Sequence, residues 1–145
     1  MFSYGANNEL ALSAEPITQL VGLNGHGKSS IPLILEEILF NKNSKGVKKG
    51  DIPNRELSAQ KYSATLDFEL DGLEYKIELS RSGAQQKVKL LQNGTDISSH
   101  TATDTFKQVE QLIGLDFKTF SQIVYQNSQS SLQFLTATDT ARKNF

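Results

Sequence analysis

The chain contains no cysteine and no tryptophan, and its 145 residues include only three prolines and two histidines, His26 and His100. Without cysteine, and with histidines so few, disulfide frameworks, zinc fingers, iron–sulfur clusters and cysteine nucleophiles are excluded. No run of 18 apolar residues is present, and the first ten residues lack the basic-then-apolar pattern of a secretory signal. These absences predict a soluble, cytoplasmic protein with no membrane partner.

An excess of charge of one sign is missing as well. Fifteen lysines and arginines stand against sixteen aspartates and glutamates, which gives a formal net charge of -1. This balance argues against a uniformly basic nucleic-acid binder but allows a local basic patch. The length suits one domain, and a hydrophobic fraction of 37% is enough for a core.

One motif carries chemistry. Residues 22–29 read GLNGHGKS and match G-x-x-x-x-G-K-[ST] in full. The glycines let successive backbone N–H groups point inward at phosphate oxygens. Lys28 reaches the β- and γ-phosphates, and the Ser29 hydroxyl is a ligand for Mg²⁺. A chance match in a chain of this length has a probability on the order of 0.5%. We interpret His26, at a variable position of the loop, as a solvent-facing residue.

The segments on either side of this phosphate loop have the order that the motif requires, strand then helix. Ile17–Val21 is a short apolar run between Pro16 and Gly22, which predicts a buried strand. After the loop, apolar residues at positions 31, 34, 35, 38 and 39 predict a helix, with Pro32 near the end of its first turn.

Residues 41–61 are rich in lysine and show no apolar period, so we expect an exposed loop. Two interpretations remain open for this Lys-rich loop. The favoured one is a solvated loop. The other is a contact with a nucleic-acid backbone through Lys42, Lys45, Lys48 and Lys49.

The pattern then changes to strict alternation over residues 62–97. Two period-2 runs flank Asp71-Gly72, and a third, less regular run ends at Asn93-Gly94, which predicts an antiparallel meander with one wet face. A helix is predicted over about 103–113, ended by Gly114. Residues 117–125 end in a strand-like run, and a further helix is expected at the C-terminus.

Five pieces of the sequence occur in an order typical of one family: FSYG, GLNGHGKSS, KKGD, IGLDFKTFSQIV and LQFL. In this order they resemble the SbcC-type, SMC-like DNA-repair ATPases, and most closely the recombination endonuclease or exonuclease ATPase subunits of tailed phages. The resemblance implies an α/β fold of the P-loop NTPase class. The chain would be the N-terminal lobe of an ABC/SMC-type ATPase head with an antiparallel β-meander, and therefore a partial domain.

The resemblance also implies roles for individual residues. ATP phosphates would be bound by Asn24, Gly25, His26, Gly27, Lys28, Ser29 and Ser30, with Mg²⁺ on Ser29. The glutamine of the family's Q-loop falls on Ser128, between Gln126 and Gln129, so any of these three is a possible metal ligand. The Asp-Glu pair and the Ser-Gly-Gly signature of the family are missing here, because both belong to a C-terminal lobe beyond a coiled coil. We therefore expect no catalytic residue in this chain.

The implied function is the ATP-binding subunit of a DNA-end-processing nuclease complex, in which ATP binding and hydrolysis drive head dimerisation and control a nuclease. Its partners would be the C-terminal lobe of the same ATPase, a second head, a nuclease subunit and double-stranded DNA. Its location would be the host cell cytoplasm if the protein is phage-encoded. The segments would be the phosphate loop 22–29, the Lys-rich loop 41–61, the meander 62–97, a helix and Q-loop-like region 101–135, and the start of the coiled coil 136–145.

Two alternatives stay open. One is another ATPase of the ABC/SMC class, acting in chromosome structure or transport. The other is a nucleotide-binding fragment that does not hydrolyse ATP, which is also what we expect of this chain in isolation.

Overall fold

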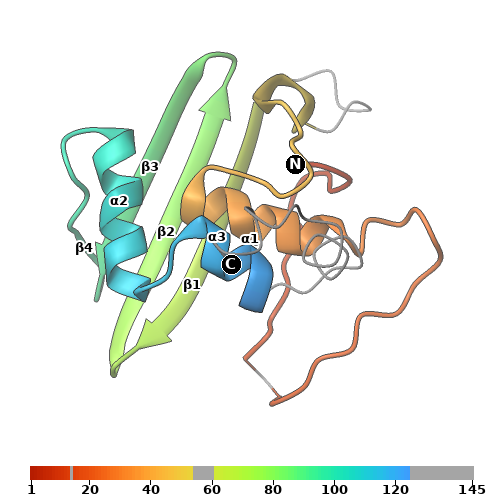
Figure 1. Ribbon diagram of the computed structural model, residues 1–145, viewed down its shortest axis with the longest axis horizontal. Helices are drawn as coiled ribbons and strands as arrows, with labels where there is room; N and C mark the ends of the chain where they lie inside the picture. The colour runs from red at the N-terminus through yellow and green to blue at the C-terminus, as the bar shows by residue number, and fades with distance from the viewer. Residues whose placement is uncertain (14, 54–60, 125–145) are drawn as a thin grey trace, which may run out of the picture.

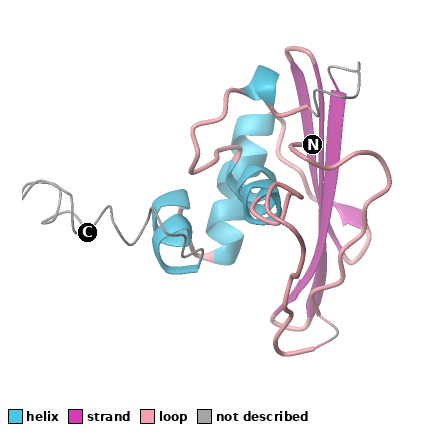
Figure 2. Cartoon of the chain, turned by 90° about the vertical axis from the view of Figure 1, so that its right-hand side faces the viewer, coloured by secondary structure: helices cyan, strands magenta, loops and turns pink. Residues whose placement is uncertain are grey.

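The computed structural model describes residues 1–13, 15–53 and 61–124, and it shows one antiparallel sheet with helices packed on one of its faces (Figures 1 and 2). The described elements are α1 (Ser30–Phe40), η1 (Lys49–Asp51), β1 (Lys61–Leu70), β2 (Leu73–Ser82), β3 (Gln85–Gln92), β4 (Thr95–Asp96), α2 (Ala102–Ile113), α3 (Phe117–Thr119) and η2 (Phe120–Val124). Among the described residues before Ser30 there is neither helix nor strand.

The four strands form a meander in the order β1-β2-β3-β4, as the alternation predicts. Two of its turns have left-handed conformations at both central residues: φ is 52° and 77° at Asp71-Gly72, and 47° and 80° at Asn93-Gly94. Such turns match the right-handed twist of the strands that they join. The predicted meander and both predicted turns are confirmed.

One face of the meander forms most of the core. Cross-strand neighbours Leu66, Ile77 and Leu90 point to this face, and Ile77 and Leu90 are fully buried. The opposite face is mainly polar and includes an ion pair between Asp67 and Lys76 at 3.2 Å. The face that meets the helices therefore accounts for the burial, and the predicted wet face is confirmed.

Two helices cover the apolar face. α1 is confirmed, and its Pro32 is the third helical residue, in the first turn where a missing backbone N–H is tolerated. α2 packs on β3 through Phe106 and the fully buried Val109. It begins where the Thr101 hydroxyl accepts a hydrogen bond from the N–H of Asp104, and it ends at Gly114 with φ of 68°.

The strand-like reading of residues 117–125 is wrong for the part that the structure describes. Residues 117–124 form the helical turns α3 and η2. The Asp116 carboxylate caps this turn by accepting a hydrogen bond from the N–H of Thr119 at 2.8 Å. Phe117 and Phe120 then pack against Phe40 of α1, with ring centroids 5.8 and 5.2 Å away. The cap and the aromatic contacts outweigh the strand propensity of the run.

The predicted buried strand at Ile17–Val21 is also wrong in this structure. The segment is irregular, and the Ile17 and Val21 side chains are 87% and 83% exposed. A strand that leads into a phosphate loop is normally covered on both faces and paired at both edges. Within the described part of the chain, the meander closes through its own turns, and no strand pairs with this segment.

Candidate nucleotide-binding site

The phosphate loop turns at two glycines with left-handed backbone conformations, Gly25 with φ of 83° and Gly27 with φ of 85°. Among the described residues, the N–H groups of Gly25, Gly27, Lys28 and Ser29 donate to no backbone carbonyl. Unpaired amides of consecutive residues in such a turn form a cavity suited to an anion. The loop therefore offers backbone donors at the point that the motif predicts.

Lys28 lies across the beginning of its own loop. Its ammonium group donates hydrogen bonds to the carbonyl oxygens of Gly22 and Leu23, the second at 2.8 Å. These oxygens are weak, neutral acceptors, and a phosphate oxygen would bind the same ammonium more strongly because that hydrogen bond is charge-assisted. The position of Lys28 is thus compatible with a phosphate group bound by the loop.

The two serines at the start of α1 have different surroundings. Ser29 is exposed and its hydroxyl makes no capping hydrogen bond, so this oxygen is available as a cation ligand. Ser30 is buried, and its hydroxyl lies 3.2 Å from the hydroxyl of Ser3. Ser30 therefore joins the helix start to the N-terminal segment.

Gly27 is required for a second reason, which the motif alone does not reveal. A Cβ at this position would lie 2.9 Å from the Cβ of Ser3 and 3.6 Å from the Tyr4 ring. The N-terminal segment is itself held by a hydrogen bond from the N–H of Phe2 to the carbonyl of Ile52. The FSYG segment thus supports the back of the phosphate loop, which gives this part of the sequence a structural role.

The other predicted nucleotide-contacting residues, Asn24 and His26, are exposed. The three Q-loop candidates, Gln126, Ser128 and Gln129, lie outside the described residues, as does the expected start of the coiled coil at 136–145. Within the described ranges, no group of three or more metal-ligating side chains occurs.

Sequence reasoning missed the surroundings of Glu36 and Glu37, which are fully buried near the end of α1. Glu36 Oε2 accepts the N–H of Ser44 at 2.7 Å, and Glu37 Oε1 accepts Nδ2 of Asn43 at 2.7 Å. Burial raises the pKa of Glu36, and the hydrogen bonds from Ser44 only partly oppose it. The available signal was a pair of acidic residues inside the apolar run ILEEILF. These carboxylates hold the Lys-rich loop.

Lys49 corrects the reading of the Lys-rich loop as uniformly solvated. Its ammonium pairs with Glu37 and also donates to the carbonyl of Asn41 at 2.7 Å, and its side chain is only 30% exposed. Burial lowers the pKa of Lys49, and the Glu37 charge opposes this shift. Lys45 and Lys48 are exposed, as expected. A contact of this loop with nucleic acid stays a prediction.

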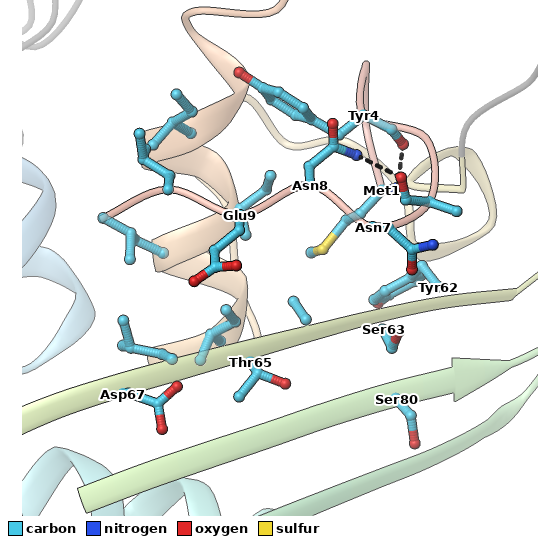
Figure 3. Close-up of a pocket in the computed structure, with 18 of the residues that line it drawn as sticks. Met1, Tyr4, Asn7, Asn8, Glu9, Tyr62, Ser63, Thr65, Asp67 and Ser80 are labelled. Atoms are coloured by element: carbon cyan, nitrogen blue, oxygen red, sulfur yellow. Dashed lines mark hydrogen bonds between the residues drawn. The ribbon is translucent and has the colours of Figure 1, made fainter. Parts of the chain in front are cut away.

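A wide groove of about 2000 Å³ runs beside the site, between the N-terminal segment, α1 and β1 (Figure 3). Apolar side chains of α1 form one wall, with Ile31, Ile34 and Leu35 only half-buried. β1 forms the other wall and is an edge strand, so one row of its backbone groups has no strand beside it in the described structure. The groove is an incompletely covered surface next to the phosphate loop.

The helices in the described part of the chain are too short to span a lipid bilayer.

Comparisons with known proteins show which proteins this chain resembles. The chain is 42% identical over 146 residues to a protein of Escherichia phage T5 named "Probable exonuclease subunit 2", covering 100% of this chain and 24% of that protein. It is 28% identical over 145 residues to "Exonuclease subunit 2" of Enterobacteria phage T4, covering 99% of this chain and 25% of that protein. It is 27% identical over 127 residues to the "DNA double-strand break repair Rad50 ATPase" of Methanococcus maripaludis, covering 88% of this chain and 12% of that protein.

The chain thus spans about a quarter of the length of the two phage relatives. Their names agree with the resemblance drawn from the sequence motifs. Residues 1–144, nearly the whole chain, match the family described as "AAA domain". The chain therefore belongs to the AAA domain family.

Proposed function

We propose that this chain is the ATP-binding N-terminal lobe of the ATPase head in a DNA-end-processing nuclease complex. The observation that carries the proposal is the phosphate loop, in which unpaired amides, the Lys28 ammonium and the free Ser29 hydroxyl meet at the start of α1. The likeness to two phage exonuclease subunits and to a Rad50 ATPase supports the assignment to DNA processing.

The residues present fit ATP with Mg²⁺. Amides of the loop and the N-terminus of α1 would hold phosphate oxygens, because both present partial positive charge. Lys28 would leave the carbonyls of Gly22 and Leu23 and bind the terminal phosphates. Ser29 would supply a hydroxyl oxygen, which suits Mg²⁺ as a hard cation. The metal would neutralise charge on the phosphates, and this chain's own residues would orient them.

Exposed apolar residues near the phosphate loop support the proposal that this chain is one lobe of a larger ATPase head. Residues 17–23 expose Ile17, Val21 and Leu23, and the groove beside them is lined by half-buried apolar side chains of α1. We infer that the C-terminal lobe of the same ATPase covers this surface and orders the strand before the phosphate loop. P-loop NTPase architecture, head dimerisation, a nuclease subunit, double-stranded DNA and a place in the host cytoplasm all belong to this proposal.

One observation favours nucleotide binding without hydrolysis for the chain in isolation. The two acidic residues of α1 that follow the phosphate loop, Glu36 and Glu37, are bound to Ser44, Asn43 and Lys49. They are thus held away from a position from which a carboxylate could activate water. We infer that the isolated chain binds nucleotide and does not hydrolyse it.

Calorimetric titration with ATP and Mg²⁺ tests the proposal. Lys28→Ala should abolish binding and leave the fold intact, because the ammonium group's hydrogen bonds to described residues all lie within its own loop. Lys89→Ala removes the same charge from an exposed position on the polar face of the sheet, so it is the matched control and should bind as the unaltered chain does. Unchanged affinity in Lys28→Ala would refute the nucleotide site. Phosphate release by the isolated chain at about one turnover per second, a rate usual for enzymes, would refute the inference that it lacks hydrolysis.

A further inference from the structure

A second hollow, of about 280 Å³, lies away from the phosphate loop. It is bounded by Gly50 of η1 and by Gly83 of the β2–β3 turn, which lie at the same end of the sheet (Figure 1). Lys49, Tyr62 and Arg81 contribute side chains to its lining. Tyr62 and Arg81 also border the wide groove, whereas Lys49 lines this hollow and not the groove.

The hollow has more hydrogen-bond donors than acceptors. Arg81 uses Nε for the carbonyl of Gly83 at 3.3 Å and Nη1 for Gln86 Oε1 at 2.8 Å, which leaves three of its five N–H groups. The Tyr62 hydroxyl is buried and has no partner among the described residues. A buried hydroxyl without a partner is unfavourable, so a ligand or water is expected to satisfy it.

Lys49 adds to this surplus. Its ammonium has three N–H groups, of which Glu37 and the Asn41 carbonyl use two. Both carboxylate oxygens of Glu37 are already occupied, one by Asn43 and the other by Lys49. The two charged residues that line the hollow, Lys49 and Arg81, are both cations, and Glu37 pairs with Lys49. The group that completes this hollow is therefore an anion with several acceptor oxygens.

We propose that the hollow binds a phosphate group of the DNA backbone, held by Arg81 and Lys49 and by the Tyr62 hydroxyl as an uncharged donor. Arginine suits this role because its planar guanidinium matches two phosphate oxygens at once. Lys48, which directly precedes η1, is exposed and adds a positive charge beside the hollow. The proposal rests on the proposed function, which supplies the DNA.

The test uses the intact protein, a fluorescent duplex oligonucleotide and anisotropy titrations over a range of salt concentrations. Arg81→Gln removes one charge from the hollow. Tyr62→Phe removes only the unpartnered hydroxyl, so this variant should unfold at the same temperature as the unaltered protein or at a higher one. Lys89→Gln is the matched control, because Lys89 is exposed on the opposite face of the sheet. Lys49 is unsuitable for substitution, since its loss would leave Glu37 buried without a counter-ion.

Arg81→Gln should weaken DNA binding on the order of tenfold, as expected for a charged hydrogen bond. It should also reduce the slope of log affinity against log salt by about 0.9, the value for one phosphate contact. Tyr62→Phe should weaken binding about fivefold with an unchanged slope, because the hydroxyl carries no charge. Lys89→Gln should change neither quantity.

ATP titrations of the same variants distinguish the sources of phosphate. ATP affinity should stay unchanged in Arg81→Gln and Tyr62→Phe. A loss of ATP affinity with unaltered DNA binding would overturn the DNA assignment in favour of a free nucleotide. Unchanged binding of both ligands in both variants would overturn the site itself. If Lys28→Ala still binds ATP normally, the proposed function fails instead, whatever the salt slopes show.

Discussion

The meander and the segment before the phosphate loop both contain apolar residues, but these residues are buried in the meander and exposed in the segment. In the meander, each strand from β1 to β3 pairs with its sequence neighbour, and Ile77 and Leu90 reach full burial. In the segment before the phosphate loop, Ile17 and Val21 remain 87% and 83% exposed. Hairpins supply their own hydrogen-bond partners within a few residues, whereas a strand paired at both edges needs partners from elsewhere in the sequence. The long strands of the meander therefore find partners within the described residues, whereas the segment before the phosphate loop pairs with no strand there.

The largest expected effect is on stability, and it differs between a substitution in the meander and one in the segment before the phosphate loop. Ile77→Ala should lower the free energy of unfolding by about 4 kcal/mol, because it opens a cavity at a fully buried position. Ile17→Ala should change it by less than about 0.5 kcal/mol in this chain, as is usual for exposed positions. Urea unfolding curves of the two variants measure both values.

Ile77→Ala and Ile17→Ala can also be compared in the full ATPase, in which the proposed C-terminal lobe accompanies this chain. There, Ile17→Ala should become destabilising by about 2 kcal/mol or more, because neighbouring strands would then cover Ile17. An equally small effect of Ile17→Ala in both proteins would show that this segment stays uncovered, which contradicts the lobe assignment.

A smaller effect is expected from pH. Burial raises the pKa of Glu36 from its ordinary 4.5, so the folded state favours the protonated carboxyl. The stability that this proton contributes is fully present below pH 4.5 and is lost as the pH rises through the folded-state pKa. Relative to Glu36→Gln, the unaltered chain should therefore lose stability as the pH rises above 4.5. The total loss is about 1.4 kcal/mol for each unit by which folding raises the pKa of Glu36.

Unfolding curves at a series of pH values measure this difference, with the exposed Glu69→Gln as a control for the loss of one charge. The carboxyls with lowered pKa, Asp96, Asp104 and Asp116, lose their contribution only as the pH falls below their ordinary 3.8, outside this window. A stability difference between the unaltered chain and Glu36→Gln that does not change with pH would contradict the buried, proton-binding state of Glu36.

The sequence predicts the parts of the fold that depend on local signals. Alternation and the Asp71-Gly72 turn predict the β1–β2 hairpin, Gly114 predicts the end of α2, and the glycine spacing predicts the phosphate loop. In each case the signal and the structure lie within a few residues of one another, so no distant contact has to be known.

The features that sequence reasoning missed depend on contacts between distant segments. Glu37 is buried because Lys49, twelve residues away, pairs with it. Residues 117–124 are helical because Phe120 packs on Phe40. Gly27 must be small because Ser3 lies against it. Apolar period and propensity carry no information about such partners.

Hydrogen–deuterium exchange of the intact protein, with and without ATP and Mg²⁺, tests most directly whether the phosphate loop is the nucleotide site. Peptides covering residues 22–30 should become strongly protected by nucleotide, since their amides would then donate to phosphate oxygens. Peptides from β1 to β3 should exchange equally slowly in both states. Lys28→Ala should remove the protection. Unprotected residues 22–30 at saturating ATP, or the same protection in Lys28→Ala, would show that the nucleotide does not bind through this loop.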